Sequence, residues 1–227
     1  MSSSAIDLGP VWLTLQLATI TVLILLTVGT PIAWWLAHTR SKLRVGIEAV
    51  VALPLVMPPT VLGFYLLILL GPNGLVGSPV QALTGSPLSF SFAGVVFAST
   101  LYSLPFVVQP LQSNFESLGR APIETAASLG ASKLDAIFSV ILPLSRRGYL
   151  TATILGFAHT LGEFGVVLMV GGNIPGETKV ISIEIYDRVE VMEYSRAHIL
   201  SGGLLFFSFL VLLMVYSINK KLPVNVS

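Results

Sequence analysis

The sequence contains no cysteine and very little charge. Only 10% of its 227 residues are charged, whereas soluble domains carry about 25%. The absence of cysteine excludes disulfides and thiolate metal sites, and a net charge of +1 predicts no nucleic-acid partner. Between Glu48 and Glu116 there is no Asp, Glu, Lys or Arg at all. A water-facing surface does not tolerate so long an uncharged stretch, so lipid or protein must cover it.

The sequence also lacks the motifs of an enzyme. No phosphate-binding GxxxxGK[ST] segment, HExxH, GxSxG or paired-aspartate motif is present. His159 and Glu163 lie one helical turn apart and would make an acid–base pair in an intramembrane enzyme. No nucleophile accompanies them, and two ligands alone make a poor metal site. We therefore expect no enzymatic site, no metal and no cofactor on this chain.

Hydrophobic residues make up 54% of the chain and gather in five long runs, each able to cross a hydrocarbon core of about 30 Å. We predict an all-α integral membrane protein, a five-helix transmembrane bundle that forms a single domain over residues 1–227. The N-terminal segment lacks the basic start and the cleavage site of a signal peptide, so the first run is expected to remain as a span. The runs cover residues 11–37, 49–70, 90–111, 149–171 and 197–218.

Basic residues lie mainly on one side of these predicted spans. Nine of the twelve Lys and Arg residues fall between spans one and two, between spans three and four, or after span five. Because basic residues concentrate in cytoplasmic loops, the N-terminus is predicted outside and the C-terminus inside. The loop at about 115–148 is then cytoplasmic, and the loop at about 172–196 is external. The nine residues are Arg40, Lys42, Arg44, Arg120, Lys133, Arg146, Arg147, Lys220 and Lys221.

The predicted cytoplasmic loop has the pattern of two short helices around a glycine. Pro122 suits a first helical position, and Glu124 lies in the first turn, where the helix dipole favours an anion. Gly130 is suited to the left-handed conformation that ends a helix, and Ser132 to capping the next one. Pro143 is expected to end the segment. The pattern predicts a rigid helical knob with an apolar stripe, formed by Leu134, Phe138 and Ile141.

This segment resembles the "EAA" cytoplasmic loop of ABC-importer permeases, which docks on the ATP-hydrolysing subunit. Thr125 stands where the family usually has alanine, a change of a few tenths of a kcal/mol in helix propensity. The alternative for this segment is an ordinary loop that connects two spans. The alternative for the whole chain is a passive channel or scaffold, in which the knob would have no function. The residues assigned to coupling by the resemblance are Glu124, Ala126, Ala127, Gly130, Ser132, Leu142 and Pro143.

Prolines and polar residues interrupt the predicted spans. Prolines remove backbone donors and kink or unwind helices, and transporters use such broken helices along their substrate path. Kinked packing against neighbouring helices is the alternative. Glu163 is expected to have a structural or gating role, either by pairing across a subunit interface or as a polar group satisfied within the bundle. The candidate path residues are Pro58, Pro59, Thr60, Ser103, Thr160, Gly162 and Glu163.

Three passages resemble the permeases of bacterial molybdate ABC importers: LPLVMPPTVLGFYLL, LGEFG and NIPGET. The resemblance extends from about Leu13 to Tyr216. It implies the multi-pass pore subunit of an importer that moves molybdate across the bacterial cytoplasmic (inner) membrane. The alternative is a sulfate or tungstate permease, although sulfate permeases tend to be longer and to have an extra span.

The resemblance also implies the partners. Two copies of the chain would form the pore, cytoplasmic ATPase subunits would bind ATP and Mg, and a periplasmic or extracellular binding protein would select molybdate. That protein would dock near Asn173, Pro175, Gly176 and Glu177.

The external segment Val180–Met192 fits two conformations. Ile181, Ile185, Val189 and Met192 would share one face of an amphipathic helix with an acidic opposite face, whereas Ile181, Ile183 and Ile185 also fit strand alternation.

Overall fold

The computed structural model describes residues 7–220, which are helical and contain no β-strand. Lys221, one of the basic residues behind the predicted orientation, lies outside the described residues. The elements are α1 (Gly9–His38), α2 (Leu43–Val56), α3 (Pro59–Leu70), α4 (Gly77–Thr84), α5 (Phe92–Leu118), α6 (Ala121–Ser128), α7 (Lys133–Ala136), a π-helical turn (Ile137–Ile141), α8 (Leu142–Leu161), α9 (Gly165–Gly171), α10 (Ile181–Glu190) and α11 (Tyr194–Lys220).

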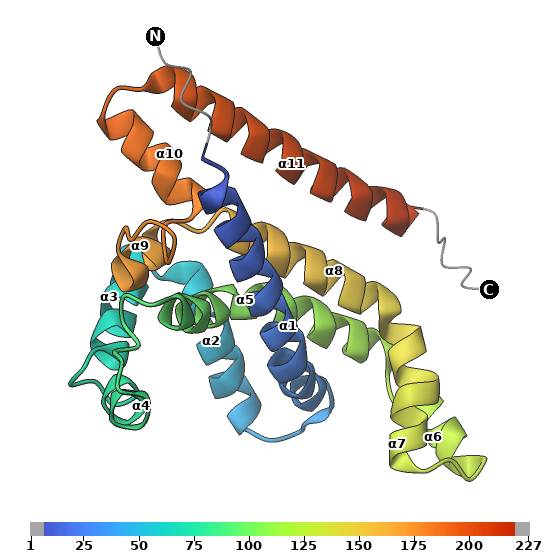
Figure 1. The fold of residues 1–227 in the computed structure, drawn as a ribbon. Helices are drawn as coiled ribbons and strands as arrows, with labels where there is room; N and C mark the ends of the chain where they lie inside the picture. The colour runs from blue at the N-terminus through green and yellow to red at the C-terminus, as the bar shows by residue number, and fades with distance from the viewer. Residues whose placement is uncertain (1–6, 221–227) are drawn as a thin grey trace.

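Three long helices form the centre of the molecule, where α1 crosses α5 and α8 (Figure 1). Leu25, Leu36, Leu111 and Phe115 are fully buried there. The helices approach closely at Gly156 of α8, where an added Cβ would lie 2.7 Å from a methyl group of Val107. Burial of these large apolar side chains fixes the frame on which the broken helices are mounted.

The five predicted apolar runs all appear as helices. Within the described residues α1, α5 and α11 are each long and apolar enough to cross a membrane. Two further spans are bent pairs, α2 with α3 at 114° and α8 with α9 at 64°. Five spans result if each bent pair counts as one.

The break between α2 and α3 follows directly from the two adjacent prolines. The helical region is disfavoured for a residue that precedes proline, and both Met57 and Pro58 precede one. Their ψ angles are 135° and 134°, in the extended range. Two successive extended residues turn the chain sharply, so α3 begins at Pro59 in a new direction.

The two bent spans pack against each other through α3 and α9. A Cβ added to Gly63 would lie 2.8 Å from the Cβ of Met169, and one added to Gly165 would lie 2.9 Å from the Cβ of Pro59. Glycine is therefore required on both helices for this close approach. The proline-rich passage and the LGEFG passage, far apart in sequence, meet here.

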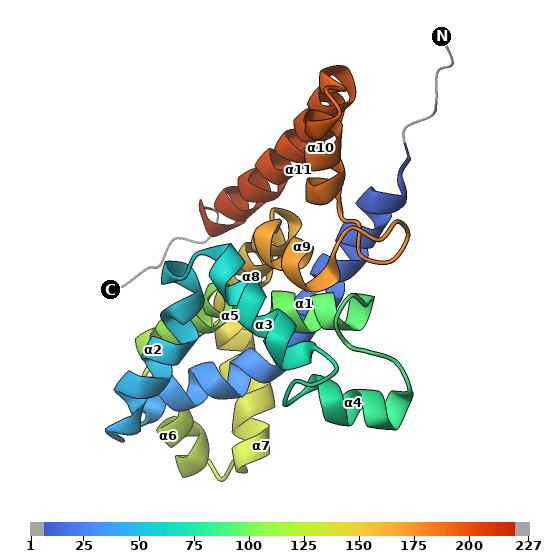
Figure 2. The ribbon, with the colours of Figure 1, turned by 90° about the vertical axis from the view of Figure 1, so that its left-hand side faces the viewer.

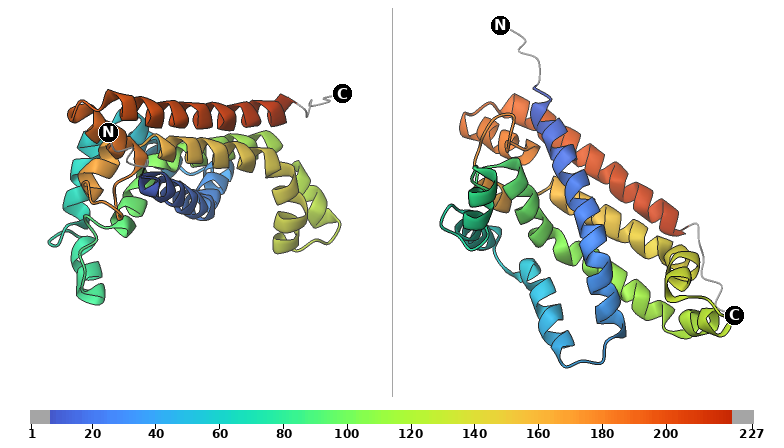
Figure 3. Two further views of the ribbon diagram at one scale, coloured as in Figure 1. Left: turned by 45° about the horizontal axis from the view of Figure 1, so that its top comes forward. Right: turned by 60° about the horizontal axis from the view of Figure 1, so that its bottom comes forward.

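Two features of the fold were not predicted. The short helix α4 lies between the second and third spans, at the periphery below α3 (Figure 2). The last helix, α11, lies along one side of the bundle with only 6% of its span buried (Figure 3). An apolar helix so exposed must be covered by lipid or by another chain.

The segment predicted to be external is a helix rather than a strand, but its buried face differs from the prediction. Ile181 and Ile183 are buried, whereas Val189 and Met192 are 44% and 76% exposed. Glu184, expected on the acidic outer face, is only 5% exposed. The helix ends at Glu190, before Met192, the last residue of the predicted apolar face. Glu184 is buried because Lys179 and Arg188 neutralise its charge.

The close packing of α3 on α9 predicts that Gly63→Ala lowers the free energy of unfolding by about 1–3 kcal/mol, the usual effect of overpacking. Gly202→Ala in α11, where nothing lies within 4 Å of the added Cβ, serves as control. It should be neutral or slightly stabilising, since alanine is the better helix former. Unfolding by SDS in mixed micelles measures both, and equal stability of the two variants would contradict the packing argument.

Candidate functional site

The predicted knob, residues 121–141, has the two helices that the sequence predicts. Gly130 has a φ of 86°, in the left-handed region. The N–H of Gly130 donates to the carbonyl of Ala127 and the N–H of Ala131 to that of Ala126, both at 3.0 Å. These are the two bonds of a Schellman motif. On the other side of the turn, Ser132 Oγ accepts from the N–H of Asp135 at 3.2 Å, as predicted for a cap.

Pro143 does not end the segment, contrary to the prediction. The chain continues from α7 through the π-helical turn into α8, with Pro143 in the first turn of α8. The N–H of Leu142 bonds back to the carbonyl of Ile137, five residues earlier. Because proline lacks an N–H, its place beside a π-turn leaves no donor unpaired. The chain bends here, so the knob projects from the bundle (Figures 1 and 3).

The knob presents large apolar side chains on its surface. Leu129 is 84% exposed, Leu134 68% and Phe138 66%. Ala126 and Ile141 are buried, and Ile141 belongs to the central apolar cluster that includes Leu111 and Phe115. Arg120, at the start of the knob, donates to the carbonyl of His38 at the end of α1, 2.9 Å away. The knob is thus a rigid apolar projection tied to the first span.

The breaks in the two bent spans border one open cavity of about 590 Å³. It brings together Pro59, Thr60, Gly162 and Glu163 of the predicted path residues. Pro58 lies at the break and is exposed, whereas Ser103 and Thr160 are buried. Eleven residues line the cavity: Pro59, Thr60, Tyr102, Ala158, His159, Gly162, Glu163, Phe164, Gly165, Leu168 and Met169.

The carboxylate of Glu163 is satisfied within the bundle, which is one of the two alternatives that the sequence left open. Ser99 Oγ donates to one of its oxygens and Ser103 Oγ to the other, each at 2.5 Å. The side chain is 1% exposed. Both serines belong to α5, so Glu163 fixes the end of α8 against the third span.

His159 completes this network. Its Nδ1 lies 2.9 Å from Ser103 Oγ and 3.5 Å from a carboxylate oxygen of Glu163. Since the single hydrogen of the Ser103 hydroxyl goes to Glu163, Nδ1 must carry a hydrogen and donate at the 2.9 Å contact. The ring stacks on Phe106, with centroids 3.8 Å apart, and contacts Tyr102. No metal cluster of three His, Cys, Asp or Glu residues occurs among the described residues.

The four predicted docking residues, Asn173, Pro175, Gly176 and Glu177, are all exposed on one loop. Thr178 closes the loop by donating to the carbonyl of Gly171 at 2.7 Å and accepting from the N–H of Ile174 at 3.2 Å. Asn173 donates to both carboxylate oxygens of Asp187 at 2.9 Å. Asn173 is therefore a brace for the loop as well as part of its surface.

Charged residues connect this loop to α10. Lys179 lies 2.8 Å from Glu184 and 2.6 Å from Asp187, and Arg188 lies 2.6 Å from Glu184. Burial alone would raise the pKa of Asp187, but hydrogen bonds from Lys179 and Asn173 outweigh it and lower the pKa. Because that pKa is depressed, the contribution of Asp187 to stability is complete above its ordinary pKa of 3.8 and is lost as the pH falls through the lower value.

Two contacts next to this site were not predicted from the sequence. Ser182 donates to the backbone carbonyl of Glu163 at 2.5 Å, and Tyr186 contacts the ring of Phe164. Both residues lie on α10, and neither belonged to the apolar face predicted for this segment.

The buried carboxylate predicts that Ser103→Ala lowers the free energy of unfolding by about 1–3 kcal/mol, because a buried acceptor loses its donor. Ser113→Ala, at an exposed position of the same helix, should change it by less than about 0.5 kcal/mol. SDS titration in mixed micelles compares the two. Indistinguishable variants would mean that Ser103 is not a required donor to Glu163.

Comparison with known proteins places this geometry in a family. A model of the family described as binding-protein-dependent transport system inner membrane component matches residues 29–222. The chain is 59% identical over 220 residues to the molybdenum transport system permease protein ModB of Azotobacter vinelandii, covering 97% of both chains. It is 33% identical over 193 residues to a probable sulfate transport system permease protein of Zygnema circumcarinatum, covering 85% of this chain and 67% of that one.

The fold has a counterpart among solved structures. A chain of a bacterial ABC transporter involved in the import of the acidic polysaccharide alginate superposes with a TM-score of 0.70 at 18% identity, covering 97% of this chain and 79% of that chain. The predicted importer-permease fold and inner-membrane location are thus confirmed. The chain belongs to the family of binding-protein-dependent transport system inner membrane components.

Proposed function

We propose that this chain is the pore subunit of an ATP-driven importer of molybdate, organised as one domain over residues 1–227. The observation that carries the proposal is the 59% identity to the Azotobacter vinelandii permease along 97% of both chains. The sulfate relative is 33% identical and longer than this chain, as expected for the alternative family. Tungstate resembles molybdate in size and charge, so it is the substrate to compare first.

The exposed knob supports docking of a separate ATPase subunit. Leu129, Leu134 and Phe138 form an apolar surface that suits a groove on a partner. ATP and Mg bind to that partner, since this chain carries no phosphate-binding loop. The knob and the 173–177 loop lie toward opposite ends of the molecule (Figure 1). This separation supports a cytoplasmic knob, an external loop, and an N-terminus outside with the C-terminus inside.

The cavity at the two breaks supports a path that holds the anion weakly. It offers the Thr60 hydroxyl and the His159 ring but no Lys or Arg, and the Glu163 carboxylate is turned to its serine donors. Weak binding favours conduction because a tight site would trap the ion. Selection then lies with the external binding protein, docked on the loop of Pro175, Gly176 and Glu177. Two copies of the chain enclose the path.

The uptake experiment tests this function. Proteoliposomes containing the chain, its ATPase and its binding protein should take up labelled molybdate only when ATP is present. A tenfold excess of sulfate should leave uptake almost unchanged. Uptake abolished by sulfate would move the assignment to sulfate, and uptake without ATP would contradict the role of the knob.

Gly130→Val tests coupling. A β-branched residue at a φ of 86° is strained, so the turn between the knob helices should change shape. We expect molybdate uptake to fall at least tenfold with ATP hydrolysis retained and normal membrane insertion. The control is Gly46→Val in α2, where nothing lies within 4 Å of an added Cβ. Normal uptake by Gly130→Val would show that this turn is not needed for coupling.

A further inference from the structure

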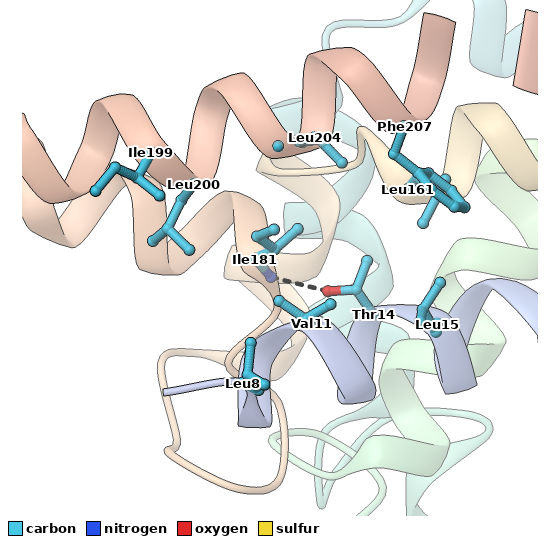
Figure 4. A pocket seen from close by; sticks show the side chains of 11 residues that line it. Leu8, Val11, Thr14, Leu15, Leu161, Ile181, Ile199, Leu200, Leu204 and Phe207 are labelled. Carbon is cyan, nitrogen blue, oxygen red and sulfur yellow. Dashed lines mark hydrogen bonds between the residues drawn. The ribbon is translucent and has the colours of Figure 1, made fainter. Parts of the chain in front are cut away.

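The external helix α10 is attached to two spans at its first two residues. The N–H of Ile181 donates to Thr14 Oγ1 of α1 at 2.8 Å (Figure 4). The Thr14 hydroxyl in turn donates to the carbonyl of Pro10. The hydroxyl of Ser182, the next residue, donates to the backbone carbonyl of Glu163 at 2.5 Å. The start of α10 therefore connects the first span to the break in the fourth.

The carbonyl of Glu163 has a particular need for this bond. Glu163 lies between the end of α8 at Leu161 and the start of α9 at Gly165, outside both helical ladders. A backbone carbonyl released at membrane depth must find a donor inside the protein. Ser182 supplies it, on the residue whose carboxylate is held by Ser99 and Ser103.

A second contact joins α10 to the same break. The ring of Tyr186 lies against that of Phe164, with centroids 5.1 Å apart. At the other end, Lys179 and Asn173 bind Asp187 of α10. The 173–177 loop, α10 and the break thus form an unbroken series of contacts from the outer surface to the cavity.

The side of this junction that faces α11 is open. An apolar cavity of about 340 Å³ lies between α11 and the start of α10 (Figure 4). Leu161, the last residue of α8, and Ile181, the first of α10, both line it. Leu204 and Phe207 of α11 line it from the other side, so the space between α11 and the start of α10 is not filled by side chains of the described chain.

We propose that Ser182 is a positioning residue that transmits binding-protein docking on the 173–177 loop to the break at Glu163. This inference rests on the proposed function, since it assigns docking to that loop and the path to that break. When the binding protein moves the loop, α10 moves with it, and Ser182 carries the movement to the Glu163 carbonyl. The coupling passes through the hydrogen bonds of Asn173 and Ser182 and the ring contact of Tyr186 rather than through proximity alone.

The test uses the reconstituted complex, in which ATPase rates are measured with and without the molybdate-loaded binding protein. Ser182→Ala should lower the stimulation ratio about fivefold, the factor that one hydrogen bond of ordinary net strength provides. The rate without binding protein should change less than twofold, whereas a merely structural defect would lower both rates together. Ser182→Thr keeps the hydroxyl and should restore most of the stimulation. Ser201→Ala, at an exposed position of α11, is the matched control.

Equal stimulation of Ser182→Ala and the unaltered chain would overturn the inference. If Ser182→Ala does not assemble, Thr14→Val tests the attachment of α10 to α1 instead. We expect the same loss of stimulation in that variant. Full stimulation of Thr14→Val would also overturn the inference. Failure of the unaltered complex to take up molybdate would instead refute the proposed function. The two failures are therefore separable in one set of vesicles.

Discussion

A backbone or carboxylate oxygen in the hydrocarbon layer must be given a donor by the protein itself, and the arrangement around Glu163 follows from that constraint. The break after α8 releases a carbonyl, and the side chain adds a carboxylate at the same residue. Ser99 and Ser103 bring α5 to the carboxylate, while Ser182 brings α10 to the carbonyl. One residue thus sets the relative positions of the third span, the fourth span and α10.

The local features of this chain could be predicted because each depends on a few neighbouring residues. The five apolar runs gave the five helical segments, with the second and fourth bent. The turn at Gly130 and the cap at Ser132 follow from the conformational freedom of glycine and the short reach of a serine hydroxyl. The break at Pro58 follows from the restriction that a proline places on the residue before it.

The features that could not be predicted depend on residues distant in sequence. Ser182 and Ser103 both bond to Glu163, from positions 19 and 60 residues away in the sequence. Hydrophobic periodicity does not predict such pairs. The prediction of which face of α10 is buried was wrong. Lys179, which lies outside the helix, neutralises Glu184 and allows that side chain to be buried. Pro143 did not end the helical segment because it lies just after a π-helical turn, where its lack of an N–H leaves no backbone donor unpaired.

The bend between the knob and α8 has a mechanical consequence. Pro143 forms no backbone hydrogen bond through its nitrogen, so the helical ladder is interrupted at the bend. The rest of α8 is stiffer, because Gly148 lies against Asn114 and Gly156 against Val107 with no space for an added Cβ. The knob is joined to the bundle both through this bend to α8 and through the hydrogen bond of Arg120 to the end of α1, so a displacement of the knob acts on two spans at once.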